Sequence, residues 1–235
     1  MPLQNKIVVT GGTGRFAQSL KKTKSKFNFI YPSKNKLNIT NLNSIYNFLK
    51  KTKPKSVLHL AGLSRPMNIH EKKISESIKL NIIGTSNLVM ACSKLKIKLI
   101  YFSTSYVYPG NKGNYSEKDS LLPWNNYGWS KLGGESAVQM YNNSLILRVC
   151  MTEKPFVHKK AFANVKLNFI FHEDLAKLLI KVIKKKGTLN LGGPTRTVYN
   201  FAKKYNPKVK KIYNKNIFPV KPFMNLNKLK KIIKL

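Results

Sequence analysis

Acidic side chains are scarce in this sequence. Its 235 residues include 8 aspartates and glutamates against 44 lysines and arginines, which gives a formal net charge of +36. A chain this basic attracts polyanions such as nucleic acid, anionic membranes and phosphorylated metabolites. The lysines are spread along the whole chain beside abundant asparagine, and no arginine cluster or recognition motif accompanies them. We therefore interpret most of the charge as compositional drift, with a share that helps to bind an anionic cofactor and substrate, and we expect no nucleic-acid partner.

Cysteine, clustered histidine and long apolar runs are also scarce. Cys92 and Cys150 lie far apart and outside any Cys-x-x-Cys pattern, and the four histidines lack metal-ligand spacing. The sequence therefore predicts neither a disulfide framework nor a metal site. No apolar run approaches the roughly 20 residues of a membrane span, and no signal-peptide core precedes the first apolar segment. We expect a cytoplasmic protein with no membrane partner.

Short apolar segments alternate with helical patterns over the first 150 residues. Strands are expected at residues 6–10, 27–31, 56–60, 98–102 and 145–148. Helices are expected at residues 14–22, 40–49, 78–91 and 127–141. This alternation predicts an α/β fold, a Rossmann-type doubly wound parallel sheet. In such sheets, ligands bind outside the carboxyl ends of the strands.

The pattern loosens after Arg148. We predict an NAD(P)-binding Rossmann domain over residues 1–150 and a small, shortened substrate-binding lobe over residues 151–235. Within the second part, residues 171–185 are expected to form a helix that packs back on the Rossmann core. A strand at 188–191 and short helices at 198–204 and 225–233 are expected as well.

A glycine-rich turn, Thr10-Gly-Gly-Thr-Gly-Arg-Phe-Ala17, follows the first expected strand and opens a helix. Gly11 permits the tight turn, and Gly14 lets a pyrophosphate approach the backbone at the positive end of the helix. Ala17 is still small enough for close helix–sheet packing. The position of the turn after the first strand predicts a dinucleotide site.

The segment after the second strand, Tyr31-Pro-Ser-Lys-Asn-Lys36, lacks the acid that usually binds the ribose 2′-hydroxyl of NAD. Ser33, Lys34 and Arg15 would suit a 2′-phosphate. We therefore favour NADP as the cofactor and keep NAD as the alternative, because acids are missing from most of the chain.

Tyr127 and Lys131 lie four residues apart and share one face of a helix. A neighbouring ammonium can lower the pKa of a phenol, which is ordinarily about 10, towards the range of acid–base catalysis. Thr104 stands at the end of an expected strand, where its hydroxyl can hold a substrate oxygen beside the phenol. The three residues together predict a catalytic site, which the Tyr-x-x-x-Lys spacing alone would not.

These motifs resemble, in order, those of an extended short-chain dehydrogenase/reductase, most closely the dTDP-4-dehydrorhamnose reductase group. The resemblance is carried by the glycine turn, Ala61-Gly62, Asn81 in Asn-Ile-Ile-Gly-Thr, Ser103-Thr-Ser-Tyr-Val-Tyr108, Gly110–Glu117 and Tyr127-x-x-x-Lys131. It is specific from about residue 6 to 150 and looser beyond. The family usually has acids where Asn38, Asn41 and Ser105 stand.

The resemblance implies a role for each matching residue. Thr104, Tyr127 and Lys131 are expected to be catalytic. The cofactor site is expected to comprise Thr10, Gly11, Thr13, Gly14, Arg15, Phe16, Ser33, Lys34, Asn38, Ile39, Ala61, Gly62, Asn81, Tyr127 and Lys131. The substrate is expected to meet Ser105, Tyr106 and Arg148. Two alternatives stay open: Asn81 as a satisfied polar helix residue, and Arg148 as the partner of an acid such as Asp174.

The resemblance therefore implies an NADP-dependent reductase of a 4-keto-6-deoxy nucleotide-sugar and leaves a homodimer open. Three other functions compete with it: a nucleotide-sugar epimerase or dehydratase, a non-catalytic sugar-nucleotide-binding or regulatory subunit, and a nucleic-acid-binding protein. Dehydratases usually place an acid pair directly after the catalytic threonine, whereas Ser105 and Tyr106 follow it here. The intact Thr104, Tyr127 and Lys131 argue against a non-catalytic subunit.

Overall fold

A six-stranded, all-parallel sheet forms the centre of the computed structural model, which describes residues 5–215 and 217–233. The strands follow the order β10-β5-β4-β3-β1-β2 across the sheet. Their bounds are Lys6–Thr10 (β1), Asn28–Ile30 (β2), Ser56–His59 (β3), Lys98–Thr104 (β4), Ser144–Val149 (β5) and Gly187–Leu191 (β10). Within the described residues, no helix is long and apolar enough to cross a membrane.

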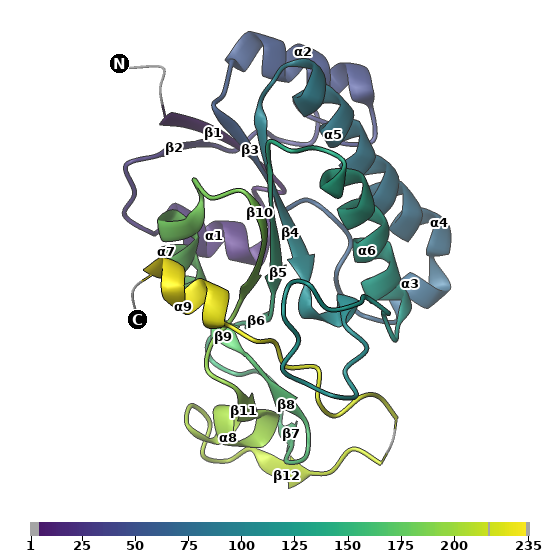
Figure 1. Ribbon diagram of the computed structural model, residues 1–235, viewed down its shortest axis with the longest axis vertical. Coiled ribbons are helices and arrows are strands. Elements are labelled where there is room, and N and C mark those ends of the chain that lie inside the picture. Colours follow the sequence, from purple (N-terminus) through teal and green to yellow (C-terminus); the bar gives the residue numbers. More distant parts are fainter. Residues whose placement is uncertain (1–4, 216, 234–235) are drawn as a thin grey trace.

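Helices cover both faces of the sheet (Figure 1). One face carries α1 (Arg15–Lys21), α7 (His172–Val182) and α9 (Asn227–Ile233), and the other carries α2 (Leu42–Thr52), α5 (Gly84–Lys94) and α6 (Asn126–Gln139). The strand periodicity explains the two layers, because alternate side chains point to opposite faces. Ile7 and Val9 of β1 join the α1/α7 layer, whereas Val8 joins the α2/α5 layer. The predicted α/β doubly wound fold is confirmed.

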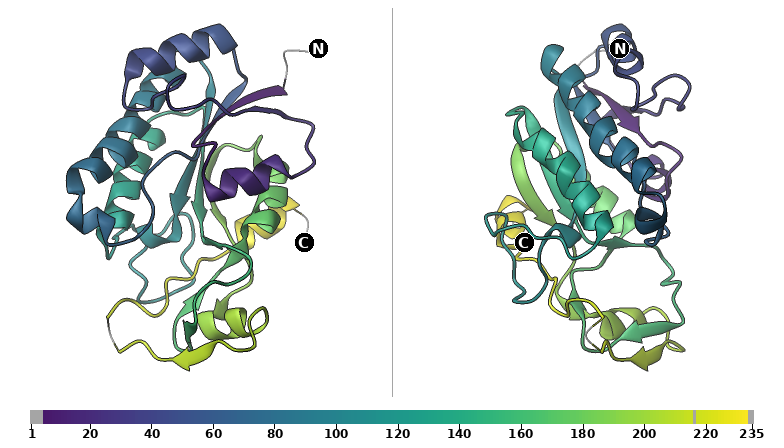
Figure 2. Two further views of the ribbon diagram at one scale, coloured as in Figure 1. Left: turned by 180° about the vertical axis from the view of Figure 1, so that it is seen from behind. Right: turned by 90° about the vertical axis from the view of Figure 1, so that its right-hand side faces the viewer.

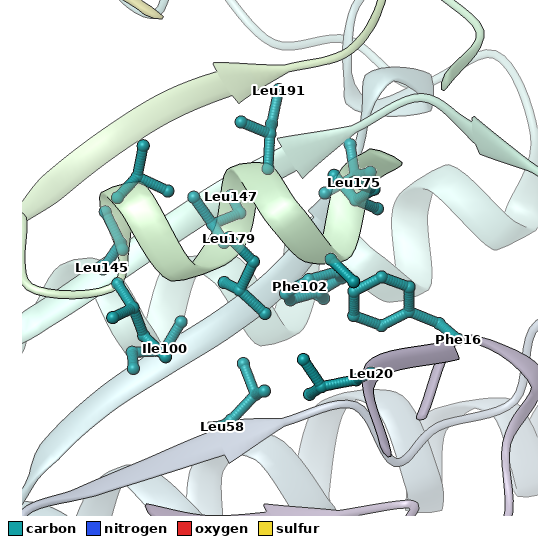
Figure 3. Packing of buried hydrophobic residues seen from close by; sticks show 14 of the residues in the cluster. Phe16, Leu20, Leu58, Ile100, Phe102, Leu145, Leu147, Leu175, Leu179 and Leu191 are labelled. Carbon is teal, nitrogen blue, oxygen red and sulfur yellow. The ribbon is translucent and has the colours of Figure 1, made fainter. Parts of the chain in front are cut away.

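The packing of the α1/α7 layer is dense. Leucines of α7 interdigitate with aliphatic side chains of the central strands, and Phe16 and Leu20 of α1 close the cluster (Figure 3). Phe16 packs on Phe102 with 5.0 Å between ring centroids. This layer fixes α1, and with it the glycine turn that precedes it, against the sheet.

The segment between β3 and β4 is not the single helix that was expected. It consists of α3 (Ile69–Lys72), α4 (Ile74–Ser77), a π-helical segment (Ile78–Ile83) and α5. π-helical turns are rare in proteins overall, and those that occur lie frequently at functional sites. Here the π-helical segment contains Asn81, which is buried.

The expected boundary at residue 150 needs correction, because the chain returns to the sheet after it. The helix expected at residues 171–185 does pack back on the core, as α7 beside α1. In addition, β10 pairs with β5, and α9 lies against β10. The separate lobe, at the bottom of Figure 1 and visible from two other sides in Figure 2, holds the intervening segments. Its elements are β7 (Lys160–Phe162), β8 (Lys166–Leu167), β11 (Arg196–Thr197), α8 (Val198–Lys203) and β12 (Lys210–Ile212).

The short pair β6 (Met151–Thr152) and β9 (Ile170–Phe171) joins the lobe to the sheet. The lobe has its own apolar cluster, which includes Phe156, Leu167 and Phe201. The helix expected at residues 198–204 is confirmed as α8. Strands of two or three residues carry no periodicity that a sequence pattern could reveal, so the strands of the lobe could not be predicted. It lies beyond the carboxyl ends of β4 and β5 (Figure 1).

Candidate active site

Thr104 and Tyr127 meet at the carboxyl end of β4. Thr104 is the last residue of that strand, and Tyr127 is the second residue of α6, whose first turn is capped by Asn125 through a 2.8 Å hydrogen bond from the Gly128 amide. The Thr104 side chain lowers the pKa of Tyr127. Burial outweighs this effect, so the pKa of Tyr127 lies above its ordinary value. Tyr127 is therefore a protonated phenol at neutral pH.

Lys131 lies one helical turn beyond Tyr127 and is 8% exposed. Its ammonium sits 4.2 Å from the centre of the Tyr101 ring. Burial lowers the pKa of Lys131 to about 7, against a raising contribution from Glu135. The groups that lower the pKa of Tyr127 are Thr104 and Arg65. Lys131, which was expected to lower it, is not among these groups.

A cavity of about 310 Å³ opens beside Tyr127, between the end of the sheet and the lobe. It is lined by Met67, Asn68, Glu71, Tyr106, Trp124, Asn125, Tyr127, Val165, Leu167, Phe218 and Pro222. Trp124 stacks on Phe218 with 5.6 Å between ring centroids, and Tyr106 meets Tyr127 edge-on at 5.9 Å. The buried Trp124 Nε1 has no hydrogen-bond partner within the described residues. An apolar cavity with a few polar groups beside a phenol suits a small organic substrate.

The glycine turn provides the cradle that a dinucleotide needs. Gly11 has a φ of +70°, and a Cβ there would lie 2.7 Å from the backbone nitrogen of Ala61. Gly14 precedes α1 and leaves its first turn without a side-chain cap. The amides of that turn can therefore meet a diphosphate, and Thr13, Gly14 and Arg15 are exposed beside them. The residues present fit a dinucleotide cofactor.

Three expected cofactor contacts point into the protein instead. Thr10 Oγ1 lies 2.8 Å from His59 Nδ1 and accepts a 3.2 Å hydrogen bond from the Ala61 amide. Phe16 belongs to the core. Asn81 is 1% exposed and bonded on both sides of its amide. The side chains of these three residues are thus held within the protein, and their assignment to the cofactor site stays a prediction.

Asn81 joins two walls of the site. Its Oδ1 accepts a hydrogen bond from the Leu63 amide (2.7 Å), and its Nδ2 donates to the Leu63 carbonyl (2.9 Å) and to Ser130 Oγ (2.8 Å). Gly62 must be a glycine because a Cβ there would lie 2.7 Å from Asn81 Oδ1. Asn81 is thus a satisfied polar residue that holds the loop after β3 against α6.

The residues expected at the adenosine end lie along the segment after β2. Ser33 and Lys34 are exposed. Asn38 Oδ1 accepts hydrogen bonds from the Thr40 amide (3.1 Å) and hydroxyl (2.9 Å), which leaves its amino group for another partner. Ile39 is buried and its carbonyl accepts a 3.0 Å bond from Asn87.

Arg148 does not face the cavity. It is 3% exposed, and it pairs with Glu135 through Nη2 (2.7 Å) and Nε (3.0 Å). Its Nη1 donates to the Tyr108 hydroxyl and to the Glu117 carbonyl. The expected contact between Arg148 and substrate is therefore wrong. The alternative that Arg148 pairs with an acid is confirmed, although that acid is Glu135 of α6 and not Asp174.

Ser105 is 2% exposed, and its side chain acts on the pKa of the buried Cys150 thiol. It therefore stands behind the cavity, whereas its neighbour Tyr106 lines it.

Sequence patterns did not indicate several of the cavity residues or the ion pairs that Glu153 makes with two arginines. Trp124, Met67 and Phe218 come from three distant segments, and only the fold joins them. Glu153 Oε1 lies 2.6 Å from Arg15 Nη1 and 3.7 Å from Arg65 Nη1. The scarcity of acids and arginines was the one signal that could have drawn attention to these last three residues.

The parallel sheet, the glycine turn and the Thr104–Tyr127–Lys131 site define a Rossmann-type α/β protein of the extended short-chain dehydrogenase/reductase class. A family model described as the RmlD substrate binding domain matches residues 5–169, and the chain belongs to that family. The resemblance to the dTDP-4-dehydrorhamnose reductase group is confirmed at this level.

Two kinds of curated relative match. Methionine adenosyltransferase 2 subunit beta of Pongo abelii is 28% identical over 154 residues, which cover 61% of this chain and 46% of that protein. The dTDP-4-dehydrorhamnose reductase of Aggregatibacter actinomycetemcomitans is 26% identical over 200 residues, which cover 81% of this chain and 63% of that protein. The chain thus spans about half the length of the first of these relatives.

Solved structures share the fold over nearly the whole chain. The dTDP-4-dehydrorhamnose reductase of Bacillus anthracis str. Ames, in complex with NADP, has a TM-score of 0.86 at 21% identity and covers 98% of this chain and 92% of its own. The L780 UDP-rhamnose synthase of Acanthamoeba polyphaga mimivirus has a TM-score of 0.81 at 16% identity, covering 98% and 94%.

Proposed function

We propose that the protein is an NADP-dependent reductase of a 4-keto-6-deoxy nucleotide-sugar. The observation that carries the proposal is the convergence of Thr104 and Tyr127 at the carboxyl end of β4 beside the cavity, with Lys131 one helical turn beyond Tyr127. The family supports it, as do the reductase from Aggregatibacter actinomycetemcomitans and the NADP-bound reductase structure from Bacillus anthracis.

The geometry suits reduction of a ketone. A bound nicotinamide cofactor would supply the hydride. The raised pKa of Tyr127 keeps its phenol protonated, so it can donate its proton to the substrate oxygen as that oxygen gains negative charge. Thr104 hydrogen-bonds the same oxygen and holds it in place. We assign Lys131 to the cofactor ribose, as the resemblance implies.

We propose NADP before NAD because the segment beyond β2 presents Ser33 and Lys34 and no acid. A 2′-phosphate is attracted by such a surface, whereas a free 2′-hydroxyl would lack its usual carboxylate partner. The Kd values of NADPH and NADH, measured side by side, test this preference; tighter binding of NADH would contradict it.

A second candidate function is a non-catalytic subunit that binds a dinucleotide or sugar nucleotide. The observation that favours it is the match to methionine adenosyltransferase 2 subunit beta. Such a subunit would bind NADPH without turning over a keto-sugar. An epimerase of the same fold would instead retain tightly bound NAD through purification.

We further propose a cytoplasmic homodimer that binds no nucleic acid. The outer faces of α5 and α6 carry half-exposed apolar side chains, Met90 and Trp129 among them, which a second copy would cover. Cys92 and Cys150 are free, as suits a reducing compartment. Light scattering after gel filtration tests the dimer. Oligonucleotide binding that persists at physiological salt would contradict the proposal that the protein binds no nucleic acid.

The deciding experiment is NADPH oxidation against 4-keto-6-deoxy sugars carried on dTDP, UDP and GDP. Tyr127→Phe is expected to lower kcat by about 10²-fold or more, because it removes the proton donor and leaves the ring packing intact. Tyr213→Phe, an exposed tyrosine of the lobe, is the matched control and should keep full activity. If the wild type and Tyr127→Phe were equally inactive on every substrate, the reductase assignment would fail.

A further inference from the structure

Glu153 bridges the space between the glycine turn and the cavity. Its Oε1 lies 2.6 Å from Nη1 of Arg15, the first residue of α1, and 3.7 Å from Nη1 of Arg65, in the loop that leads to the cavity residue Met67. Oε1 is shielded from solvent, yet within the described residues it has no partner in hydrogen-bond geometry. The carboxylate is held by charge and lacks aligned donors.

The two arginines are exceptional in this chain. Only 4 of the 44 basic residues are arginine: Arg15, Arg65, Arg148 and Arg196. Arg148 is buried with Glu135, and Arg196 lies in the lobe. The remaining two converge on one of the 8 acids. In a chain whose basic residues are nearly all lysine, an arginine indicates a site that needs the planar guanidinium group. This group can donate two parallel hydrogen bonds to a pair of phosphate oxygens.

The cluster of Arg15, Arg65 and Glu153 lies near both the glycine turn and Tyr127, as its effects on the pKa values of neighbouring groups indicate. Arg65 contributes to lowering the pKa of Tyr127, and it lowers the pKa of His172 together with Arg15. Glu153 raises the pKa of His172. A dinucleotide whose diphosphate meets the glycine turn and whose nicotinamide reaches Tyr127 places that diphosphate beside this cluster.

We propose that Arg15 and Arg65 form a clamp for the diphosphate of the dinucleotide, and that Glu153 occupies the clamp until the diphosphate displaces it. The proposal rests on the proposed function to the extent that the ligand is a dinucleotide. It reassigns the Arg15 side chain from the 2′-phosphate, expected from sequence, to the diphosphate. It also gives Arg65 and Glu153 roles that the family motifs do not supply.

The exchange is favourable because one carboxylate is replaced by a group with two charges and more acceptor oxygens. The side chains of Arg15 and Arg65 are 55% and 41% exposed, so solvent screens their pairs with Glu153. Ion pairs of this kind contribute little to stability. Glu153 can therefore leave without unfolding its surroundings, and it reduces cofactor affinity only modestly while it competes.

The test compares the Kd of NADPH for the wild type, Glu153→Gln and Glu173→Gln by fluorescence titration. Removing the competitor in Glu153→Gln should lower the Kd about threefold to fivefold. Glu173→Gln removes an equal charge that also acts on the pKa of His172, but it frees no arginine, so its Kd should stay within about twofold. Arg65→Gln should raise the Kd.

A second ligand separates the two assignments of Arg15. Adenosine 2′-monophosphate carries the 2′-phosphate without a diphosphate, so Glu153→Gln should leave its Kd unchanged. An unchanged or weakened affinity of Glu153→Gln for NADPH, or an equal gain in Glu173→Gln, would overturn the clamp. Wild-type protein that binds NADPH but reduces no keto-sugar would contradict the reductase alone, whereas protein that does not bind NADPH would overturn both.

Discussion

The side-chain amide of Asn81 donates a 2.8 Å hydrogen bond to the hydroxyl of Ser130, which lies between Tyr127 and Lys131 on α6. The catalytic helix is thereby fixed to the π-helical segment and, through Leu63, to the loop after β3. The loop after β3 and helix α6, which lie far apart in the chain, are thereby held at a fixed distance. The position of Tyr127 relative to the cavity depends on this connection.

Asn81→Ala should therefore lower the free energy of unfolding by about 1–3 kcal/mol, because it leaves backbone groups of Leu63 without partners. Urea denaturation measures the effect. Ser86→Ala is the control, since its hydroxyl bonds only the Ile82 carbonyl within the same helical stretch. Equal stabilities of the two variants would show that Asn81 does not hold the helix.

Gly11→Ala tests the cofactor turn. Gly11 and Gly187 both have positive φ, +70° and +81°, but a Cβ at Gly187 meets nothing within 4 Å. Both alanine variants carry the backbone strain of about 1–2 kcal/mol, and Gly11→Ala adds a clash with Ala61. We expect it to be the less stable of the two in urea and to bind NADPH more weakly. A Gly187→Ala variant that is equally impaired in both measurements would contradict this.

Arg148→Met tests the correction of that residue's role. Removing one partner leaves the buried Glu135 carboxylate unpaired, which should reduce the stability by about 3–5 kcal/mol. The double variant Arg148→Met/Glu135→Gln removes the stranded charge and should recover much of the loss. If Arg148→Met kept its stability and raised only the KM for substrate, Arg148 would be a substrate ligand after all.

Because His59 is buried, we expect the free energy of unfolding to fall in acid. His59 is fully buried between Thr10 and Thr85, and burial lowers its pKa from an ordinary 6.5 to about 3. Between these two pH values, His59 is protonated in the unfolded chain but neutral in the folded protein. The free energy of unfolding therefore falls as the pH drops from about 6.5 towards 3. Near pH 5.5, His59 alone should account for about 1 kcal/mol.

The comparison of wild type with His59→Gln isolates this contribution. Urea denaturation at pH 7.5 and 5.5 should show a larger drop for the wild type, because glutamine does not titrate. Contributions common to both proteins cancel in this comparison. An equal drop in the two proteins would show that His59 does not account for the acid sensitivity.

The sequence allowed much of the core to be predicted because that part depends on local rules. Ile7, Val8 and Val9 alternate between the two layers as a strand requires. Thr104 ends a strand, and Tyr127 begins a helix, as expected. Their meeting follows from the rule that parallel strands present their carboxyl ends to one edge.

Contacts between distant segments could not be predicted in this way. Arg148 had two plausible partners in the sequence and took a third, Glu135, because β5 and α6 pack side by side. Trp124 and Phe218 share a cavity wall that neither segment indicates alone. The lobe itself is built from strands too short to carry a pattern.

By itself, the sequence determined the parallel α/β sheet, the glycine turn and the shared helical face of Tyr127 and Lys131. These follow from the periodicity of side chains along strands and helices and from the backbone freedom of glycine. The tertiary structure decided which charges meet and how deeply they are buried. It turned Arg148 inward, brought Arg15 and Arg65 to Glu153, and lowered the pKa of Lys131 to about 7. Ion pairing and desolvation depend on distances between segments far apart in the chain, which only the folded protein fixes.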